Sequence, residues 1–409
     1  MKILIISESI NIEDSSASKV NVALIQNLKK GGHDLKVFHF SHKKIQLEGL
    51  ECVLIPENRF SVLFLLSRFV RVFQRYTGVY INYTVEKWFG FSFTHTNDTK
   101  RIARFIKNEN LADFNLILTL SKGGSFRPHR AMLKLPNFHH KWMAYIHDPY
   151  PFHMYPRPYN WIEYGYISKE KMMRSIMENA NKIAFPSLLL KEWMQSYFPC
   201  IEDKSIVIPH QINTNIPLAK LPEYFTSNQF SLLHAGNLLK QRNPKYLLEA
   251  YTLFLEKHPE AKIVSKLYII GNNEFHKELL SQYENHSNII IKSYTEYKII
   301  ANLEKNVSVN IILEAVSEIS PFLPGKFPNC VIADKPILIL GPYYSEVKRL
   351  LGKNYPYWSE ANDSITIENT ISELYLQWKL NPHSLKLNRN DLFEYATEDY
   401  LNKILIQSN

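Results

Sequence analysis

The chain has 409 residues, of which 45% are hydrophobic and 21% are charged. These fractions are typical of a folded globular protein and exclude a disordered, collagen-like or strongly acidic chain. A single hydrophobic core rarely serves more than about 300 residues, so we expect two domains.

The formal net charge of +9 favours an anionic partner, which can be a nucleotide, a phospholipid surface or a nucleic acid. The positive excess is concentrated from Pro56 to Lys107, where nine Lys or Arg residues face three acids among many aromatic residues. Within this segment, Arg68, Arg71 and Arg75 share one face of a predicted helix. The helix either lies on an anionic membrane surface or packs on the core with a solvated basic face.

The sequence shows no sign of export or of membrane spanning. The first apolar run, Ile3–Ile6, is too short for a signal peptide, and no stretch approaches the roughly 20 apolar residues that cross a bilayer. Cys52, Cys200 and Cys330 lack CxxC spacing, which favours neither a disulfide framework nor a zinc site. We therefore expect a cytoplasmic protein, either free or peripheral at the inner face of the plasma membrane.

The first half alternates strands and helices. An apolar strand at Lys2–Ser7 is followed by a helical pattern from Val20 to Leu28, by the glycines Gly31 and Gly32, and by a second strand. This order predicts a βαβ unit with parallel strands. Further strands are predicted at residues 116–119, 141–146, 182–185 and 205–209. We expect a doubly wound α/β domain over residues 1–212.

A second α/β pattern follows a segment rich in Pro, Asn and Thr, residues 213–228, which we interpret as a linker. Strands are predicted at residues 230–236, 266–270, 288–292, 308–313 and 335–340, with a helix at 244–257. The second domain is therefore expected over residues 229–375, and residues 376–409 have a helical pattern. In parallel sheets ligands bind at the carboxyl ends of the strands, so two such domains predict a cleft between those ends.

The stretch from His234 to Pro244 is the first candidate site. Gly236 follows a strand directly and permits close approach of the backbone, and Arg242 offers a planar fork for phosphate oxygens. Pro244 suits the first turn of the next helix, whose N-terminus favours an anion. The alternative is a plain strand-to-helix connection with a surface arginine.

The stretch from Ser320 to Leu338 is the second candidate site. Pro324, Gly325 and Lys326 form a loop between a strand and a short helix, which would aim the lysine at a diphosphate. The alternative is a rigid surface loop with a solvated lysine.

Taken together, the two stretches resemble the donor half of retaining glycosyltransferases with the GT-B fold, in the family 4-like group that contains sucrose synthases and many bacterial surface-polysaccharide enzymes. The resemblance implies two Rossmann-like domains facing across a cleft, with residues 376–409 crossing back to the first domain. It also implies that Arg242 and Lys326 bind the donor diphosphate and act in catalysis. The donor-binding residues predicted in this way are Gly236, Asn237, Arg242, Tyr294, Pro324, Gly325, Lys326 and Asn329.

The chain departs from the family pattern at two positions. The family has two glutamates separated by seven residues, and the matching positions here are Pro321 and Asn329. An Asn amide can still bind the nucleotide ribose, whereas Pro321 offers no polar side chain. Glu314 and Glu318 lie nearby and are candidates to substitute.

Two segments of the first half are also similar to family sites. His147 and Asp148 end a predicted strand, where the resemblance implies contact with the transferred sugar; the alternative is a hydrogen-bonded turn. The segment Ser16, Ala17, Ser18 and Lys19 occupies the place of the family's acceptor or phosphate loop. A simple helix cap explains this segment equally well.

The resemblance implies transfer of a sugar, with retention, from a nucleotide diphosphate donor such as a UDP-sugar to a lipid-linked or polysaccharide acceptor hydroxyl. It implies no cofactor and no metal, because cations and backbone amides stabilise the leaving diphosphate. The alternatives are an inactive scaffold subunit of a polysaccharide assembly complex and a sugar-nucleotide epimerase of the same fold. A dehydrogenase is disfavoured because no GxGxxG follows a strand, and nucleic-acid binding because no known module is present.

Overall fold

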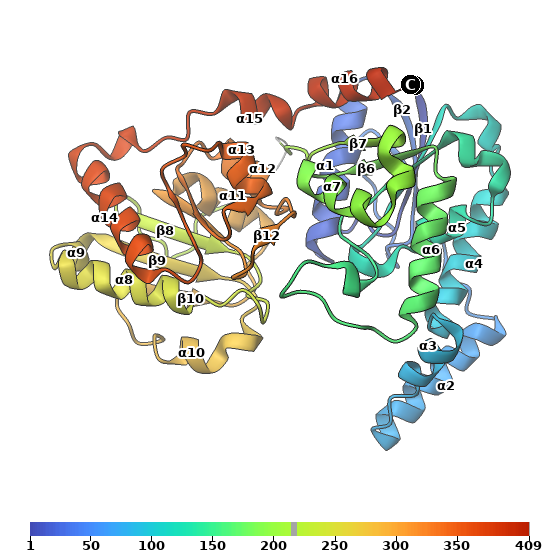
Figure 1. The fold of residues 1–409 in the computed structure, drawn as a ribbon, viewed down its shortest axis with the longest axis horizontal. Coiled ribbons are helices and arrows are strands. Elements are labelled where there is room, and N and C mark those ends of the chain that lie inside the picture. The colour runs from blue at the N-terminus through green and yellow to red at the C-terminus, as the bar shows by residue number, and fades with distance from the viewer. Residues whose placement is uncertain (214–218, 409) are drawn as a thin grey trace. The chain divides into compact units, whose positions relative to one another are not determined.

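The computed structural model describes residues 1–213 and 219–408 and divides into two compact units. Unit 1 comprises Met1–Tyr155, Tyr159–Gln211 and the chain from Glu398 onward. Unit 2 comprises Ile212–Thr397 together with Pro156–Pro158. Each unit is a parallel sheet with flanking helices (Figure 1), which confirms the predicted fold class.

The sheet of unit 1 has the strand order β3-β2-β1-β4-β5-β6-β7, and all its pairs are parallel. The strands are β1 (Lys2–Ser7), β2 (Asp34–His39), β3 (Glu51–Leu54), β4 (Leu116–Leu120), β5 (Trp142–Tyr145), β6 (Lys182–Phe185) and β7 (Ser205–Val207). The chain builds outward from β1 through β2 to β3 and then returns to the other side of β1 with β4. The strand order therefore reverses between β1 and β4.

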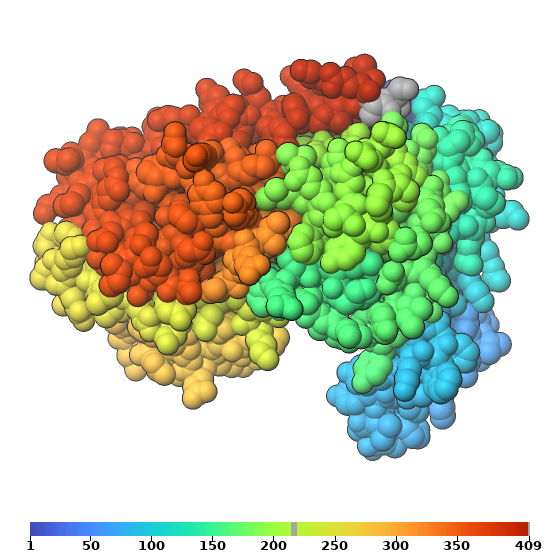
Figure 2. Space-filling model, viewed as in Figure 1, coloured from blue at the N-terminus to red at the C-terminus, as the bar shows by residue number. Residues whose placement is uncertain are grey.

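Eight helices of the described part of unit 1 accompany this sheet, with short 3-10 turns between them. They are α1 (Ser16–Lys30), α2 (Val62–Thr77), α3 (Ile81–Phe89), α4 (Phe93–Lys107), α5 (Arg127–Met132), α6 (Tyr166–Asn179), α7 (Leu188–Tyr197) and α16 (Glu398–Ser408). Of these, α2 and α3 project from the rest of the unit (Figure 1; Figure 2).

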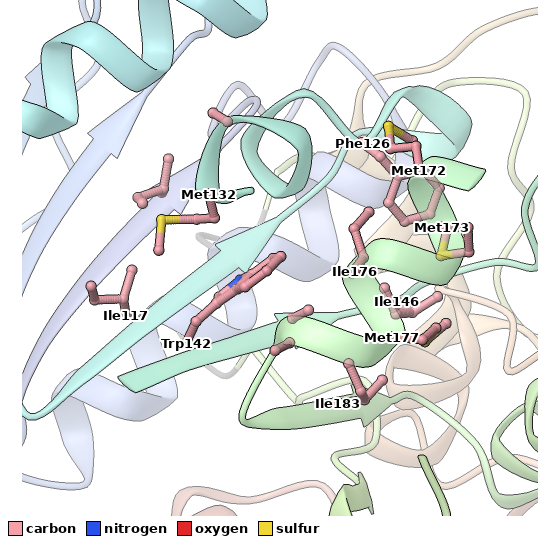
Figure 3. Close-up of a cluster of buried hydrophobic side chains, with 14 of the residues drawn as sticks. Ile117, Phe126, Met132, Trp142, Ile146, Met172, Met173, Ile176, Met177 and Ile183 are labelled. Atoms are coloured by element: carbon pink, nitrogen blue, oxygen red, sulfur yellow. The ribbon is translucent and has the colours of Figure 1, made fainter. Parts of the chain in front are cut away.

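The core of unit 1 fills both faces of the sheet. On one face α6 presents Met172, Met173 and Ile176, whose helical spacing places them on one side of the helix, toward Trp142 of β5 (Figure 3). Trp142 is fully buried, and its indole N–H donates to the hydroxyl of Thr119 at 2.9 Å. The polar atom of this large side chain is thus satisfied inside the core.

The other face is covered by α1 and by α16 from the far end of the chain. Leu401 and Leu405 of α16 are buried in the same cluster as Ile3 and Ile5 of β1. The side chain of Asn402 lies 2.9 Å from His33 Nε2 and donates to the Gly31 carbonyl at 3.1 Å. These contacts fix α16 on unit 1.

The sheet of unit 2 has the strand order β10-β9-β8-β11-β13-β15, again with parallel pairs, and β12 pairs separately with β14. Its strands are β8 (Phe230–Ala235), β9 (Ser265–Ile270), β10 (Ile289–Lys292), β11 (Val309–Leu313), β12 (Ile319–Ser320), β13 (Ile337–Leu340), β14 (Tyr344–Ser345) and β15 (Trp358–Ser359). Here the strand order reverses between β8 and β11.

The helices of unit 2 are α8 (Lys245–Lys257), α9 (Ala261–Val264), α10 (Lys277–Ser281), α11 (Tyr297–Asn306), α12 (Phe327–Ile332), α13 (Glu346–Leu351), α14 (Ser364–Leu380) and α15 (Asn390–Tyr395). Phe230 of β8, Phe254 of α8 and Tyr375 of α14 form the aromatic centre of the core, with ring centroids 5.3 to 6.1 Å apart.

The returning segment begins later in the chain than the sequence predicts. The predicted returning segment started at residue 376, but α14 continues through Leu380 and the chain packs within unit 2 as far as Thr397, so the return to unit 1 begins at Glu398. Residues 214–218 of the predicted linker lie outside the described residues. Residues 219–228 contain neither helix nor strand.

We predict that Leu401→Ala lowers the free energy of unfolding by about 2–5 kcal/mol, because it removes a fully buried side chain between α16 and the sheet. Urea unfolding followed by tryptophan fluorescence measures this loss. Ile406→Ala is the matched control, since Ile406 is 73% exposed on the same helix. Equal stabilities of the two variants would contradict the assigned packing of α16.

Candidate functional sites

Each sheet has one point at which the order of its strands reverses, and polar residues gather at both points. In doubly wound sheets the two helices flanking such a point go to opposite faces, which leaves a crevice at the carboxyl ends of the strands.

The loop after β8 is held closely against the end of β9. Gly236 donates its N–H to the Ile270 carbonyl at 2.8 Å, and Leu238 donates to the Asn272 carbonyl at 2.8 Å. Gly271 has φ +144°, and a Cβ at this position would overlap the carbonyl of Gly236. A glycine is therefore required at 271 for the close approach of the two loops. The side chain of Asn237 accepts from the Asn272 N–H at 3.3 Å, so this predicted donor residue braces the loop.

Lys326 precedes α12 and points toward the ends of β8 and β11. Its Nζ donates to the Ile311 carbonyl at 2.6 Å and lies 3.4 Å from Nδ1 of His234. Burial lowers the pKa of Lys326 to about 8, and the charge of Arg242 acts in the same direction, against the opposite effect of nearby acidic groups. An ammonium has three N–H donors, so Lys326 keeps donor capacity beyond these two contacts.

His234 is a site residue that the sequence analysis did not assign a role. It is buried in β8, and burial, then the charges of Lys326 and Arg242, hold its pKa well below the usual range. The ring is therefore neutral. Its Nδ1 faces Lys326, and its Nε2 is buried and has no hydrogen-bond partner among the described residues. A buried, unpaired ring nitrogen thus lies beside the Gly236 loop.

Glu314 follows β11 directly and is buried beside the two cations. It accepts a hydrogen bond from the Ser320 hydroxyl at 2.8 Å. Burial raises the pKa of Glu314 to about 7, opposed by that hydrogen bond and by the charges of Arg242 and Lys326. Of the two acids considered as substitutes for the family glutamates, Glu314 joins the cluster, whereas Glu318 is exposed.

The structure thus brings Arg242 and Lys326 together, since the charge of Arg242 acts on Lys326, His234 and Glu314. Pro324 and Gly325 lie half-buried in the loop before Lys326. The remaining predicted residues lie at other places of the unit. Asn329 of α12 accepts from the Tyr297 hydroxyl at 3.2 Å, and Tyr294, after β10, is 61% exposed.

The site of unit 1 is a pocket of about 370 Å³. It lies at the reversal point of the sheet, because its walls include residues that follow β1, β2 and β4. Helices α2 and α4 complete it. The lining residues are Glu8, Ser9, Asp14, Phe40, His42, Glu57, Arg71, Thr94, Asp98, Lys122, Ser125 and Arg127.

A buried ion cluster forms the floor of this pocket. Arg127 contacts Glu8 at 2.5 Å and Asp98 at 3.1 Å, and both carboxylates are almost fully buried. Glu8 also accepts from the N–H of Lys122 at 3.1 Å and from the hydroxyl of Ser125. Burial of two carboxylates is therefore offset by one shared guanidinium and by neutral donors.

Asp98 differs from Glu8 in keeping a free oxygen. Its Oδ1 is buried without a hydrogen-bond partner among the described residues, while Oδ2 contacts Arg127. Burial raises the pKa of Asp98 to about 6, and the charge of Arg127 opposes this rise. Asp98 thus carries a buried, unsatisfied carboxylate oxygen beside the pocket. The position of Glu8 directly after β1 is a local signal that could have identified it, whereas no local pattern reports the pairing of Asp98 with Arg127.

The structure does not place His147 or Asp148 among the residues that line this pocket. His147 is buried and donates from Nε2 to the Asn21 side chain at 2.8 Å. Burial, and then the neighbouring His210 and His129, lower its pKa well below the usual range, so the ring is neutral. Asp148 is half-buried near Tyr155. Their role with the transferred sugar stays a prediction.

The segment from Ser16 to Lys19 forms the first turn of α1. Ser15 is the N-cap, and its hydroxyl accepts from the Ser18 N–H at 3.1 Å. The helix-cap explanation is therefore realised, with Ser18 buried and Ser16 exposed. Binding of an acceptor or phosphate by Ser16, Ala17, Ser18 and Lys19 stays a prediction.

Within residues 1–213 and 219–408, no three His, Cys, Asp or Glu side chains gather as a metal-ligand group. Over the same residues, none of the helices is both long and apolar enough to cross a membrane.

No protein-family model matches the chain, and no curated protein matches it. Solved structures do match it over nearly its whole length. The glycosyltransferase of Rickettsia africae ESF-5 has a TM-score of 0.58 at 17% identity, with 96% of this chain and 97% of that chain covered. The UDP-forming alpha,alpha-trehalose-phosphate synthase of Burkholderia xenovorans, in complex with glucose-6-phosphate, has a TM-score of 0.63 at 10% identity, with 100% of both chains covered.

The sucrose-phosphate synthase of Thermosynechococcus elongatus gives a similar result, with a TM-score of 0.56 at 12% identity over 97% of this chain and 94% of that chain. At such low identities the likeness shows the fold alone. The chain therefore has the GT-B type of architecture that these enzymes share, as the sequence predicted.

We predict that Arg127→Ala lowers the free energy of unfolding by about 3–5 kcal/mol near pH 7.5, because it leaves Glu8 and Asp98 buried without their cation. The loss should shrink toward pH 5, since Asp98 has a raised pKa and becomes protonated first. Urea unfolding at both pH values tests this. Arg59→Ala is the control, because Arg59 is 69% exposed in its pair with Glu57 and should change stability by less than about 0.5 kcal/mol. A pH-independent loss for Arg127→Ala would contradict the prediction.

Proposed function

We propose that the protein is a glycosyltransferase that binds a nucleotide diphosphate sugar at the site of unit 2 and transfers the sugar to an acceptor hydroxyl. The observation that carries this proposal is the convergence of Arg242 and Lys326 on the carboxyl ends of β8 and β11, beside the closely packed Gly236 loop. The side chains of Arg242 and Lys326 supply positive charge, and the Gly236 loop supplies exposed backbone at the point where the strand order reverses. Both features favour binding of a diphosphate.

The chemistry asked of these residues is stabilisation of the leaving diphosphate. Arg242 offers a planar pair of donors and Lys326 a further charged donor, which together offset the negative charge that develops as the sugar bond breaks. The unpaired Nε2 of His234 adds a neutral polar atom at the same place. Glu314 is partly protonated near neutral pH, which limits its repulsion of a bound diphosphate. No metal or other cofactor is needed in this proposal.

We propose a UDP-sugar as the donor, because one matching structure is of a UDP-forming synthase. In the proposal Tyr294 reads the base and Asn329 the ribose, as the sequence resemblance implies, and the sugar is transferred with retention. The acceptor is a lipid-linked or polysaccharide intermediate at the cytoplasmic face of the membrane.

The pocket of unit 1 supports an acceptor rich in hydroxyl groups. Its lining includes four acids, Glu8, Asp14, Glu57 and Asp98, whose carboxylate oxygens accept hydrogen bonds from hydroxyl groups. Lys122 and Arg71, which also line the pocket, suit an acceptor that carries phosphate.

A second candidate is an inactive scaffold with the same fold. It is favoured by Pro321, which replaces the first family glutamate with a residue that has no polar side chain, and by the engagement of Lys326 with Ile311. An epimerase, the third candidate, would convert the donor sugar with no acceptor present.

We predict that UDP raises the thermal unfolding temperature more than other nucleoside diphosphates do, because a ligand that binds only the folded state stabilises it as RT ln(1 + [L]/Kd). Arg242→Ala combined with Lys326→Ala should abolish the shift. Lys240→Ala is the control, since Lys240 lies exposed in the same loop. A shift without sugar transfer would favour the scaffold, and no shift with any diphosphate would remove the support for a donor site.

We also predict that UDP binds about tenfold more weakly at pH 9 than at pH 7. Over this range Glu314, with a pKa of about 7, gains a negative charge, and Lys326, with a pKa of about 8, loses its positive charge. Both changes oppose a diphosphate, whose own charge is nearly constant above its second pKa near 6. Titration calorimetry at several pH values measures the affinity. Glu314→Gln should flatten the lower part of the profile, and an unchanged affinity in the native protein would contradict the prediction.

A further inference from the structure

Helix α2 exposes an apolar face to solvent. It buries only Phe64, Ser67 and Val70, whose spacing of three residues defines one narrow stripe against the unit. Leu65, Phe69, Val72 and Tyr76 recur at intervals of four, three and four on the opposite side. All four are exposed, with Phe69 at 62%. A solvated helix normally presents polar residues on its outer side, so this helix has an unpartnered apolar face.

Two neighbouring segments extend the apolar face. Tyr83 of α3 stacks on Tyr80 with ring centroids 5.4 Å apart, and on Tyr164 of the loop before α6 at 4.8 Å. The loop and α3 are in direct contact, because a Cβ at Gly165 would overlap the carbonyl of Glu86. The exposed apolar and aromatic residues of the three segments therefore form one surface of unit 1.

We call this surface the aromatic ridge. It projects from the unit at α2 and α3 (Figure 2). Its exposed members are Phe60, Val62, Leu65, Leu66, Phe69, Val72, Tyr76, Val79, Tyr80, Tyr83, Trp88, Phe89, Trp161, Ile162, Tyr164 and Ile167. Contiguous apolar surface on this scale marks an interaction site in a folded protein.

The charges of α2 beside its apolar side are all positive. Helix α2 contains no acid, and Arg68, Arg71 and Arg75 form a stripe between its buried side and its apolar side. Lys87 of α3 is exposed as well. The single acid of α3, Glu86, and Glu163 of the loop before α6 share Lys169, at 2.8 and 2.5 Å from its Nζ.

We propose that the aromatic ridge binds the surface of an anionic lipid bilayer. The order of faces on α2, with an apolar side flanked by arginines, is that of helices that lie in the plane of a membrane interface. Trp and Tyr are the residues that settle at the headgroup level, and the ridge carries Trp88 and Trp161 with four exposed tyrosines. Arginines at its edge match anionic headgroups. The stripe of cations beside the apolar face favours this occupant over a second protein chain.

The ridge and the pocket of unit 1 share a residue, because Arg71 belongs to the arginine stripe and also lines the pocket. A bilayer bound to the ridge therefore lies beside the pocket entrance. If the protein is the proposed glycosyltransferase, a lipid-linked acceptor reaches the pocket from this bilayer. Membrane binding itself does not depend on transfer activity.

Co-sedimentation with vesicles tests the inference on the full chain without nucleotide. We expect binding to vesicles that contain about one third phosphatidylglycerol and at least tenfold weaker binding to pure phosphatidylcholine vesicles. Leu65→Ser with Phe69→Ser should reduce binding at least tenfold. The same changes at Ile263 and Leu380 of unit 2, which are 79% and 88% exposed, should leave it unchanged. Arg68→Glu with Arg75→Glu should abolish the preference for anionic vesicles. All six positions are exposed, so the variants should fold.

Tryptophan emission gives a second measurement. Vesicles should shift the emission to shorter wavelength, and Trp88→Phe should reduce this shift because Trp88 is 75% exposed on the ridge. Equal binding of the native protein and the Leu65→Ser, Phe69→Ser variant would overturn the proposal. So would a concentration-dependent dimer in solution that the same variant abolishes, since the ridge would then be covered by a second copy. Vesicle binding without nucleotide binding would leave this inference standing while the proposed function fails.

Discussion

The reversal of strand order in each sheet is the constraint on which the candidate sites depend. The reversal lies between β1 and β4 in unit 1 and between β8 and β11 in unit 2. At such a point the segments that follow the two neighbouring strands go to opposite faces of the sheet. This leaves a crevice at the carboxyl ends of the strands, where polar side chains gather. In unit 1 this leaves a pocket floored by a shared ion cluster. In unit 2 it gathers Arg242, Lys326 and His234. Both sites thus follow from topology before any particular side chain is considered.

Much of the fold could be predicted from the sequence because the central strands are continuous apolar runs. The run Lys182–Phe185 was predicted with its observed bounds, and Lys2–Ser7 likewise. The strands missed were β3, β12, β14 and β15, which contain two to four residues and lack a strong apolar pattern. The late start of the returning segment was also missed, because a helical pattern does not reveal which core its apolar side joins.

The candidate site residues also fall into two groups, those that the local sequence predicts and those that only the fold brings together. Arg242 and Lys326 could be named because each ends a strand-to-helix connection, where local sequence fixes position. The pairing of Asp98 with Arg127 depends on the packing of α4 against α5, and no local pattern reports it. Helix α2 shows the limit clearly. Its sequence fits a helix packed on the core and a helix lying on a membrane surface equally well. Only the structure, in which no more than three of its side chains are buried, distinguishes the two interpretations.

The docking of α16 on the first sheet affects the order of folding during synthesis. Leu401 and Leu405 belong to the core of unit 1 but are translated after all of residues 212–397. Unit 2 therefore has its complete sequence outside the ribosome before unit 1 does, although unit 1 contains the first residues made. Until then α1 covers this face of the first sheet without α16, and the apolar surface that Leu401 and Leu405 later cover stays exposed in the nascent unit.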